Sequence, residues 1–215
     1  MKYEIIRAGE SRSFPEEHPL TAGGKDGGEI VVIIGTDAGA AFSKYGSTQE
    51  KAAVLIELST ECLGTYTGEK RGEEGSNVLG FARFRLGDTQ PSDLVELVRQ
   101  PRTAQPAIDA ARTLFEQHGL KVALCGDFAG RILDRLLRPY YNAALRRLDE
   151  GLASASDMDT TLKLGLGYPE GPIELLERTG LAHHYDVTRT LFEVYGDAAY
   201  APARRARVAK QRQER

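Results

Sequence analysis

The feature that most limits the fold of this chain is a pair of short, continuous apolar runs, Glu29–Ile34 (EIVVII) and Ala53–Glu57 (AVLIE). Neither run is long enough to cross a membrane, and neither alternates with polar residues as a strand with one wet face does. Both runs therefore predict strands that are buried on both sides of a sheet. Tyr3–Ile6 and the alternating segment Val78–Leu86 predict two further strands.

An amphipathic helix is predicted between the later strands. Thr103–His118 places Ala107, Ile108, Ala111, Leu114 and Phe115 on one face, ends at a glycine, and leads into a predicted strand at Lys121–Cys125. A succession of strand and helix predicts a parallel α/β sheet. The glycine-rich segments Thr21–Gly28 and Thr65–Ser76 are interpreted as loops.

The second half of the chain has a helical pattern. Arg131–Leu148 carries an apolar stripe too wide for a helix that covers one small core, so burial on two sides is expected. Ser156 and Asp159 have the spacing of a capping box, which predicts a helix over Asp157–Leu164. Two more helices are predicted, one from Pro172 to Gly180 and one over His184–Tyr195.

The predicted fold class is therefore α/β followed by all-α. The α/β domain is expected to span residues 1–127 and the helical domain residues 128–203, with a basic tail over 204–215. The last fourteen residues hold six basic side chains and one acidic one, and we interpret them as a frayed, solvated end. A net charge of -3 argues against general nucleic-acid binding.

Composition excludes several classes of protein. With 41% hydrophobic and 27% charged residues, the chain is neither collagen-like nor disordered. The start MKYEIIRAGE has no apolar segment of the kind found in secretory signals, and no run is long enough to span a membrane, so a cytoplasmic protein is expected. Cys62 and Cys125 lie too far apart for a zinc motif and are expected to be buried thiols, and no metal site is predicted.

From Cys125 the sequence reads CGDFAGRILDRLLRPYYNAALRRLDEGLASASDMDTTLKLGLGYPEGPIELLERTGL. It resembles L-3-hydroxyacyl-CoA dehydrogenases, whose helical domain follows the patterns D-x-P-G-F-x-x-N-R-L-L-x-P-Y-x-N-E-A, E-x-G-x-A-x-x-x-x-I-D and G-x-G-x-P-x-G-P-x-x-L-x-D-x-x-G-L-D. The matching residues are Gly130, Arg135, Leu136, Leu137, Pro139, Tyr140, Asn142, Gly151, Ala153, Asp159, Gly165, Gly167, Pro169, Gly171, Pro172, Leu175, Gly180 and Leu181.

The resemblance continues more weakly toward the N-terminus. The segments AVLIELSTECL, NVLGFARFRL and LVELVRQPRT are similar to the family's A-x-L-x-S-N-T-S-S-L, V-x-G-x-H-F-F-N-P and L-V-E-V-V-x-G-x-x-T. The likeness implies a reduced Rossmann-like domain with a parallel sheet, followed by a helical domain of the 6-phosphogluconate dehydrogenase C-terminal type. The chain resembles the decayed second copy of this unit that longer family members carry.

The resemblance implies a chemistry whose proton acceptor this chain lacks. Family members oxidise the 3-hydroxyl of an acyl-CoA with NAD, and a histidine accepts the hydroxyl proton. Ala82 stands at the position of that histidine, whereas its partner glutamate is retained as Glu96. Without an imidazole, we expect Glu96 either to face solvent or to pair with Arg83 or Arg85. The four histidines of the chain are expected to lie at the surface.

The other substrate-binding positions have changed as well. The family serine that binds the substrate corresponds to Thr60, and the preceding asparagine to Leu58. A second family asparagine corresponds to Asp134, whose carboxylate accepts hydrogen bonds but cannot donate one to a substrate carbonyl. Glu96 and Thr60 are thus the remnants of the catalytic site.

The dinucleotide site is also incomplete. The nearest approach to G-x-G-x-x-G is Gly35-Thr36-Asp37-Ala38-Gly39-Ala40, followed by Glu57 at a spacing suited to the ribose. Asp37 brings a side chain and a negative charge to the place where the backbone must approach the pyrophosphate. No bound cofactor is therefore expected, and NAD is implied by the resemblance alone.

Three functions stay open at this point. The first is a dehydrogenase-like protein of acyl-CoA metabolism, in fatty acid or aromatic degradation, catalytically impaired alone and retained for dimerisation or CoA-thioester binding. The second is an active NAD-dependent 3-hydroxyacyl-CoA dehydrogenase component that works with a catalytic partner chain. The third is a non-catalytic acyl-CoA-binding or scaffold subunit, with Arg83, Arg85 and Lys70 as candidates for binding the CoA phosphates. A homodimer through the helical domain is expected, without nucleic acid or a membrane as partner.

Overall fold

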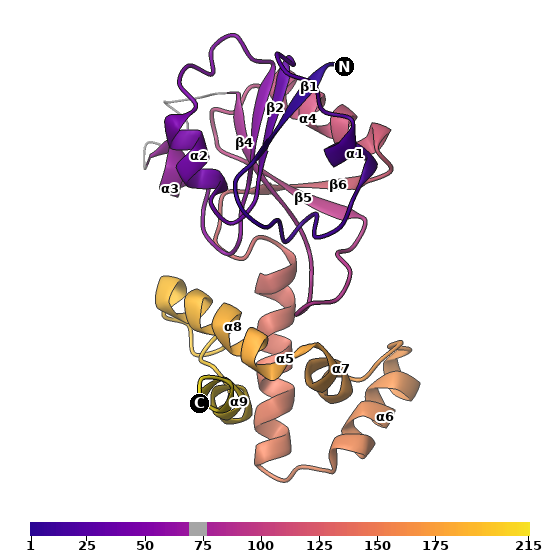
Figure 1. The fold of residues 1–215 in the computed structure, drawn as a ribbon. Helices are drawn as coiled ribbons and strands as arrows, with labels where there is room; N and C mark the ends of the chain where they lie inside the picture. The colour runs from indigo at the N-terminus through magenta and orange to yellow at the C-terminus, as the bar shows by residue number, and fades with distance from the viewer. Residues whose placement is uncertain (69–76) are drawn as a thin grey trace. The chain divides into compact units, whose positions relative to one another are not determined.

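The computed structural model describes residues 1–68 and 77–215 and divides them into two compact units (Figure 1). The α/β unit contains residues 1–85 and 91–131, and the helical unit contains residues 86–90 and 132–215. The fold class predicted from the sequence, α/β followed by all-α, is confirmed. None of the helices in the described ranges is both long and apolar enough to cross a membrane.

The α/β unit is built on six strands that lie in chain order across one sheet. The strands are β1 (Tyr3–Arg7), β2 (Ile30–Ile34), β3 (Ala53–Glu57), β4 (Val78–Arg83), β5 (Leu94–Arg99) and β6 (Lys121–Gly126). All neighbouring pairs are parallel except β4 and β5, which are antiparallel. The predicted parallel sheet is thus mostly right, but β5 was not predicted as a strand.

Alternate residues of the strands point to opposite faces of the sheet and pack into two separate hydrophobic cores. Ile30, Val32 and Ile34 of β2 pack on one face with helix α4 (Gln105–Gln117) and the short α1 (Pro19–Ala22), whereas Val31 and Ile33 pack on the other face. That second face is covered by α2 (Ala38–Lys44) and α3 (Gly64–Thr67). Both faces of β2 and β3 are buried throughout, as their continuous apolar runs predicted.

The predicted loops are correct only in part. Thr21 and Ala22 lie in the last part of α1, and Thr65–Thr67 lie in α3. The remainder of the second predicted loop, 69–76, lies outside the described residues.

The helical unit contains α5 (Leu133–Asp149), α6 (Ala155–Leu166), α7 (Pro172–Thr179), α8 (Leu181–Tyr195) and α9 (Arg204–Gln213). Its core gathers apolar residues of α5, α7 and α9. Pro139 lies inside α5 and has no N–H to donate to the carbonyl of Arg135, and the hydroxyl of Tyr200 donates to that carbonyl instead, at 3.3 Å. A proline is therefore accommodated within a continuous helix.

The basic C-terminal segment is a helix, not the frayed end that its composition suggested. Ala203 and Ala206 are buried against the core of the helical unit, and Arg204 and Arg205 both contact Asp149. The small alanines let the segment pack closely, and its charged residues find partners on α5. Neither cysteine forms a disulfide, and both are only partly buried, so the expectation of buried thiols was also wrong.

The start of α6 differs from the predicted capping box. Ser154, not Ser156, accepts the N–H of Asp157 at 3.1 Å. Asp159 instead reaches across to α7, where its two carboxylate oxygens accept the N–H groups of Ile173 and Glu174, each at 2.9 Å. The carboxylate thus satisfies two N–H groups that have no partner within α7.

We expect Asp159→Ala to lower the free energy of unfolding of the helical unit by about 2 kcal/mol, at the upper end of cap losses, because one buried and one part-buried N–H group lose their acceptor. Ser154→Ala removes an exposed cap with one such bond and serves as the matched control, with an expected loss of about 0.5–1 kcal/mol. Urea unfolding measures both. Equal losses for the two variants would contradict the assigned role of Asp159.

Candidate functional site

The pairing of β4 with β5 places Ala82 directly opposite Glu96. Both residues are buried, with 4% and 2% of their surface exposed. Residues paired in this way have their side chains on the same face of the sheet, with Cβ atoms about 4.5–5.5 Å apart. The position that holds histidine in the family thus lies beside the glutamate, as a catalytic dyad requires, but the alanine methyl group neither accepts nor donates a proton.

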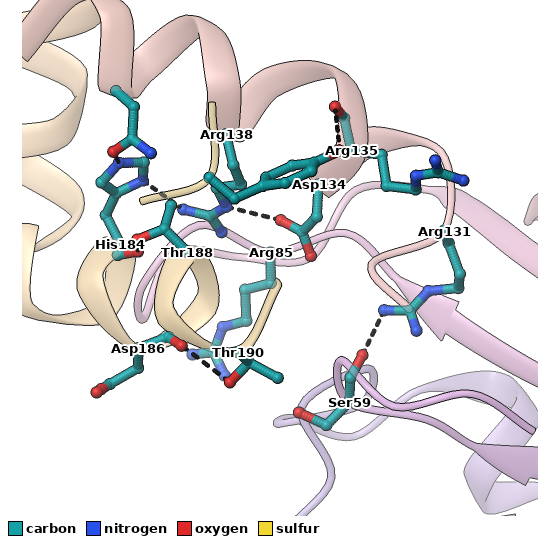
Figure 2. A network of polar contacts seen from close by, with 12 residues as sticks. Ser59, Arg85, Arg131, Asp134, Arg135, Arg138, His184, Asp186, Thr188 and Thr190 are labelled. Atoms are coloured by element: carbon teal, nitrogen blue, oxygen red, sulfur yellow. Dashed lines mark hydrogen bonds and ion pairs between the residues drawn. The ribbon is translucent and has the colours of Figure 1, made fainter. Parts of the chain in front are cut away.

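The carboxylate of Glu96 pairs with Arg131, a residue that the sequence analysis did not identify. The Nε of Arg131 lies 3.3 Å from Oε2 of Glu96. Its Nη2 donates to the carbonyl of Ser59 at 2.5 Å (Figure 2). The side chain of Arg131 is 5% exposed. The sequence did contain a sign that Arg131 is unusual. Arg131 follows the matching Gly130 and replaces the phenylalanine of the family pattern.

The predicted solvent-facing arrangement of Glu96 was therefore wrong, because Glu96 is 2% exposed. Its cation is Arg131, and Arg83, one of the two arginines predicted to pair with it, is engaged elsewhere. Arg83 donates to the carbonyls of Ser92 (2.8 Å) and Ser13 (2.9 Å), and its guanidinium lies over the ring of Phe14. Burial lowers the pKa of Arg83 from its ordinary value.

Of the other two predicted phosphate-binding residues, Arg85 lies within the described ranges and Lys70 does not. Arg85 is partly buried, and its carbonyl accepts from Arg12 at 3.5 Å. Lys70 lies outside the described residues. The proposed role of Arg83, Arg85 and Lys70 in binding CoA phosphates stays a prediction.

The two positions after β3 differ in character. Leu58 is buried and packs against Gly80 so closely that a Cβ on that glycine would lie 2.3 Å from the leucine side chain. An apolar contact thus occupies the place of the family asparagine. Thr60 is only partly buried, and its carbonyl accepts the N–H of Gly130 at 3.0 Å, which holds Thr60 near Arg131.

The turn after β2 does not fit the pyrophosphate of a dinucleotide. Such a turn must present free backbone N–H groups to the phosphates. Here the N–H of Gly35 donates to Glu57 at 2.7 Å, that of Thr36 to the carbonyl of Glu10 at 3.0 Å, and that of Asp37 to the carbonyl of Ala8 at 2.9 Å. Helix α2 that follows is only seven residues long.

Glu57, the candidate for binding the ribose, is engaged as well. Its carboxylate accepts from the backbone N–H groups of Gly35 and Ser13 and from the hydroxyl of Ser11, all at 2.7 Å. The adjoining pocket, of about 200 Å³, is lined by the carboxylates of Glu10, Glu57 and Glu61 and by one cation, Arg12. The excess of negative charge disfavours a phosphate. The residues of this region do not fit NAD.

Asp134, at the position of the second family asparagine, belongs to a buried polar chain in the helical unit. It accepts from Nε of Arg138 at 2.7 Å, and Nη1 of Arg138 lies 3.2 Å from Nδ1 of His184 (Figure 2). The other ring nitrogen of His184 lies 3.0 Å from Oδ1 of Asn142. Arg138 and His184 are each 1% exposed, so the prediction that every histidine lies at the surface was wrong.

The contacts of His184 assign its proton. Arginine always donates, so Nδ1 of His184 accepts from Arg138 and carries no hydrogen. Nε2 then donates to Asn142, whose amide nitrogen donates to the carbonyls of Ala199 and Ala201. Burial, and next the charge of Arg138, lower the pKa of His184 to about 3. The imidazole is neutral and structural, and unsuited to take up a proton near neutral pH.

This pKa predicts a loss of stability in acid. The unfolded chain protonates His184 below about pH 6.5 and the folded chain does not, so the unfolded state binds more protons. The free energy of unfolding should then fall by about 1.4 kcal/mol per pH unit between about pH 6.5 and the folded pKa of about 3. Urea unfolding at several pH values measures this slope, and His184→Gln should reduce it. An NMR titration of His184 with a midpoint near pH 6.5 would contradict the assignment.

Comparisons with known proteins agree with this architecture. The pattern of the family described as "3-hydroxyacyl-CoA dehydrogenase, C-terminal domain" matches residues 130–215. The mitochondrial hydroxyacyl-coenzyme A dehydrogenase of Sus scrofa is 43% identical over 88 residues, which are 41% of this chain and 28% of the relative. A probable 3-hydroxyacyl-CoA dehydrogenase of Caenorhabditis elegans is 40% identical over 135 residues, 61% of this chain and 42% of the relative. The matched part thus spans less than half of these curated relatives.

Among solved structures, (S)-3-hydroxybutyryl-CoA dehydrogenase from Ralstonia eutropha superposes with a TM-score of 0.70 at 25% identity, covering 84% of this chain and 64% of that one. The 3-hydroxybutyryl-CoA dehydrogenase of Escherichia coli K12 gives a TM-score of 0.70 at 22% identity, over 90% of this chain and 40% of that one, and shows the shared fold. An α/β unit followed by a helical unit is thus the fold that this chain shares with these solved dehydrogenases. Residues 130–215 match the C-terminal domain of the 3-hydroxyacyl-CoA dehydrogenase family.

Proposed function

We propose that this chain is a 3-hydroxyacyl-CoA dehydrogenase-like protein of acyl-CoA metabolism that does not catalyse the reaction by itself and is retained for dimerisation and CoA-thioester binding. The observation that carries the proposal is the pair formed by Ala82 and Glu96, with the charge of Glu96 balanced by Arg131. Loss of a general base lowers the rate by about 10²–10⁴-fold. The turn at Gly35–Asp37, which does not fit a dinucleotide, adds a second loss.

The direct test follows NADH absorbance with acetoacetyl-CoA as substrate, beside calorimetric titrations with CoA, acetoacetyl-CoA and NAD. We expect saturable binding of the thioester and no turnover above background. Turnover by the purified chain, abolished by Glu96→Gln, would overturn the proposal and favour an active enzyme. Turnover that arises only after a second chain is added would favour the dehydrogenase component that works with a partner.

We propose in addition that the helical unit pairs two copies of the chain. Support comes from large apolar side chains exposed on α5 and α6, namely Leu136 (67% exposed), Leu164 (83%) and Leu166 (64%). Leu136 also lines an apolar pocket of about 450 Å³ with Tyr140 and other residues of this unit. Apolar surface of this kind is typical of an interface between subunits.

Light scattering during size-exclusion chromatography tests the dimer. We expect a species of twice 23.5 kDa, and Leu164→Lys should shift it toward the monomer because a charge enters the apolar surface. Glu177→Lys, a change at an exposed residue of α7, is the control and should leave the mass unchanged. A monomer of 23.5 kDa at micromolar concentration would refute this part of the proposal.

A further inference from the structure

The guanidinium of Arg131 has one nitrogen without a partner. Nε contacts Glu96 and Nη2 donates to Ser59, but Nη1 is buried and has no hydrogen-bond partner among the residues that the structure describes. Buried polar groups are nearly always paired, and a charged donor that lacks an acceptor is a particularly costly exception. The position of Nη1 is therefore suited to an oxygen atom supplied from outside the chain.

The charge of the site limits which oxygen fits. The carboxylate of Glu96 already balances Arg131, so the buried pair is neutral as a whole. A phosphate or carboxylate would add an uncompensated negative charge in a buried place, which is unfavourable. A carbonyl oxygen accepts a hydrogen bond without adding a full charge, and it is the acceptor that this donor suits.

The donor is also held in place. Arg131 has a positive backbone φ of 50°, and its Nη2 is fixed by the carbonyl of Ser59. The neighbouring Gly130 donates to Thr60, whose side chain keeps the hydroxyl of the family's substrate-binding serine. Ala82 lies opposite Glu96, and its methyl group is smaller than the imidazole that the family has at this position. The cation of Arg131 and the shortened side chain of Ala82 thus both lie beside Glu96 in the α/β unit, and the backbone of Thr60 is hydrogen-bonded to the residue before Arg131.

We propose that Nη1 of Arg131 is a fixed hydrogen-bond donor to the 3-oxo oxygen of a bound 3-oxoacyl thioester, at the place where the family carries its histidine. The inference rests on the proposed function, since it assumes that the chain binds CoA thioesters. A guanidinium keeps its protons at neutral pH, so the site binds the ketone without exchanging a proton with it. The chain would then still bind thioesters with a 3-oxo group selectively, although it no longer catalyses the dehydrogenase reaction.

Calorimetry with acetoacetyl-CoA, butyryl-CoA and CoA tests the inference. Butyryl-CoA lacks the 3-oxygen, so the wild-type chain should bind acetoacetyl-CoA at least about tenfold more tightly than butyryl-CoA. In the double variant Glu96→Leu/Arg131→Met, which removes both charges together, this ratio should fall to about one. Arg112→Met, at an exposed ion pair of the same unit, is the control and should keep the wild-type ratio.

The outcomes separate the two proposals. Equal binding of both thioesters by the wild-type chain overturns the role of Arg131 and leaves CoA-thioester binding intact. If the wild-type chain binds neither thioester, both the proposed CoA-thioester binding and the role of Arg131 are overturned. If the double variant does not fold, acetoacetyl-CoA labelled with ¹³C at the 3-carbonyl gives a second readout on the wild-type chain. A downfield shift of that resonance on binding supports the hydrogen bond, and an unchanged shift refutes it.

Discussion

Arg138→Met is expected to lower the free energy of unfolding of the helical unit by about 3–5 kcal/mol, the cost of removing one partner from a buried ion pair. Arg138 is 1% exposed and lies between Asp134 and His184, so its loss leaves a largely buried carboxylate and an imidazole nitrogen without a donor. Urea unfolding followed by circular dichroism measures the change.

Two further variants separate the charge from the side-chain volume. Asp134→Asn/Arg138→Met should regain part of the stability, because no unpaired charge then stays buried. Arg178→Met breaks an ion pair of similar length with Glu170, but Arg178 is exposed, so we expect a much smaller loss of stability than at Arg138. Equal losses of stability for Arg138→Met and Arg178→Met would show that the buried contacts of Arg138 stabilise the protein no more than a surface ion pair does.

Arg131→Met is expected to destabilise the α/β unit by a similar amount, about 3–5 kcal/mol. The reason is that Glu96 is 2% exposed and its carboxylate would lose the guanidinium that balances it. Urea unfolding of the variant and of the wild-type chain gives the value.

The double variant Glu96→Leu/Arg131→Met completes the cycle. It should be more stable than Arg131→Met alone, with an energetic coupling of about 0.5–3 kcal/mol between the two positions. Additive effects of the single changes would mean that the two side chains do not stabilise each other. In that case Arg131 would not be the replacement for the lost imidazole as partner of Glu96.

The regular elements were predictable where local pattern alone decides them. Ala53–Glu57 is a strand with the predicted bounds, because five successive buried residues of high apolar content fit a sheet covered on both faces. The strand Leu94–Arg99 was missed, because Glu96 interrupts its apolar pattern. Glu96 can be buried because its carboxylate contacts the guanidinium of Arg131. Arg131 lies 35 residues further along the chain, so a local sequence pattern does not reveal the pair.

The polar site shows the same division. The sequence by itself determined that position 82 carries no imidazole and that Glu96 and Thr60 are kept, because these are properties of single residues in a recognisable pattern. Only the tertiary structure decided that Arg131, rather than Arg83 or Arg85, balances Glu96, and that His184 is buried and neutral. Partners of buried charges are chosen by distance in space, and the fold brings together residues that are remote along the chain.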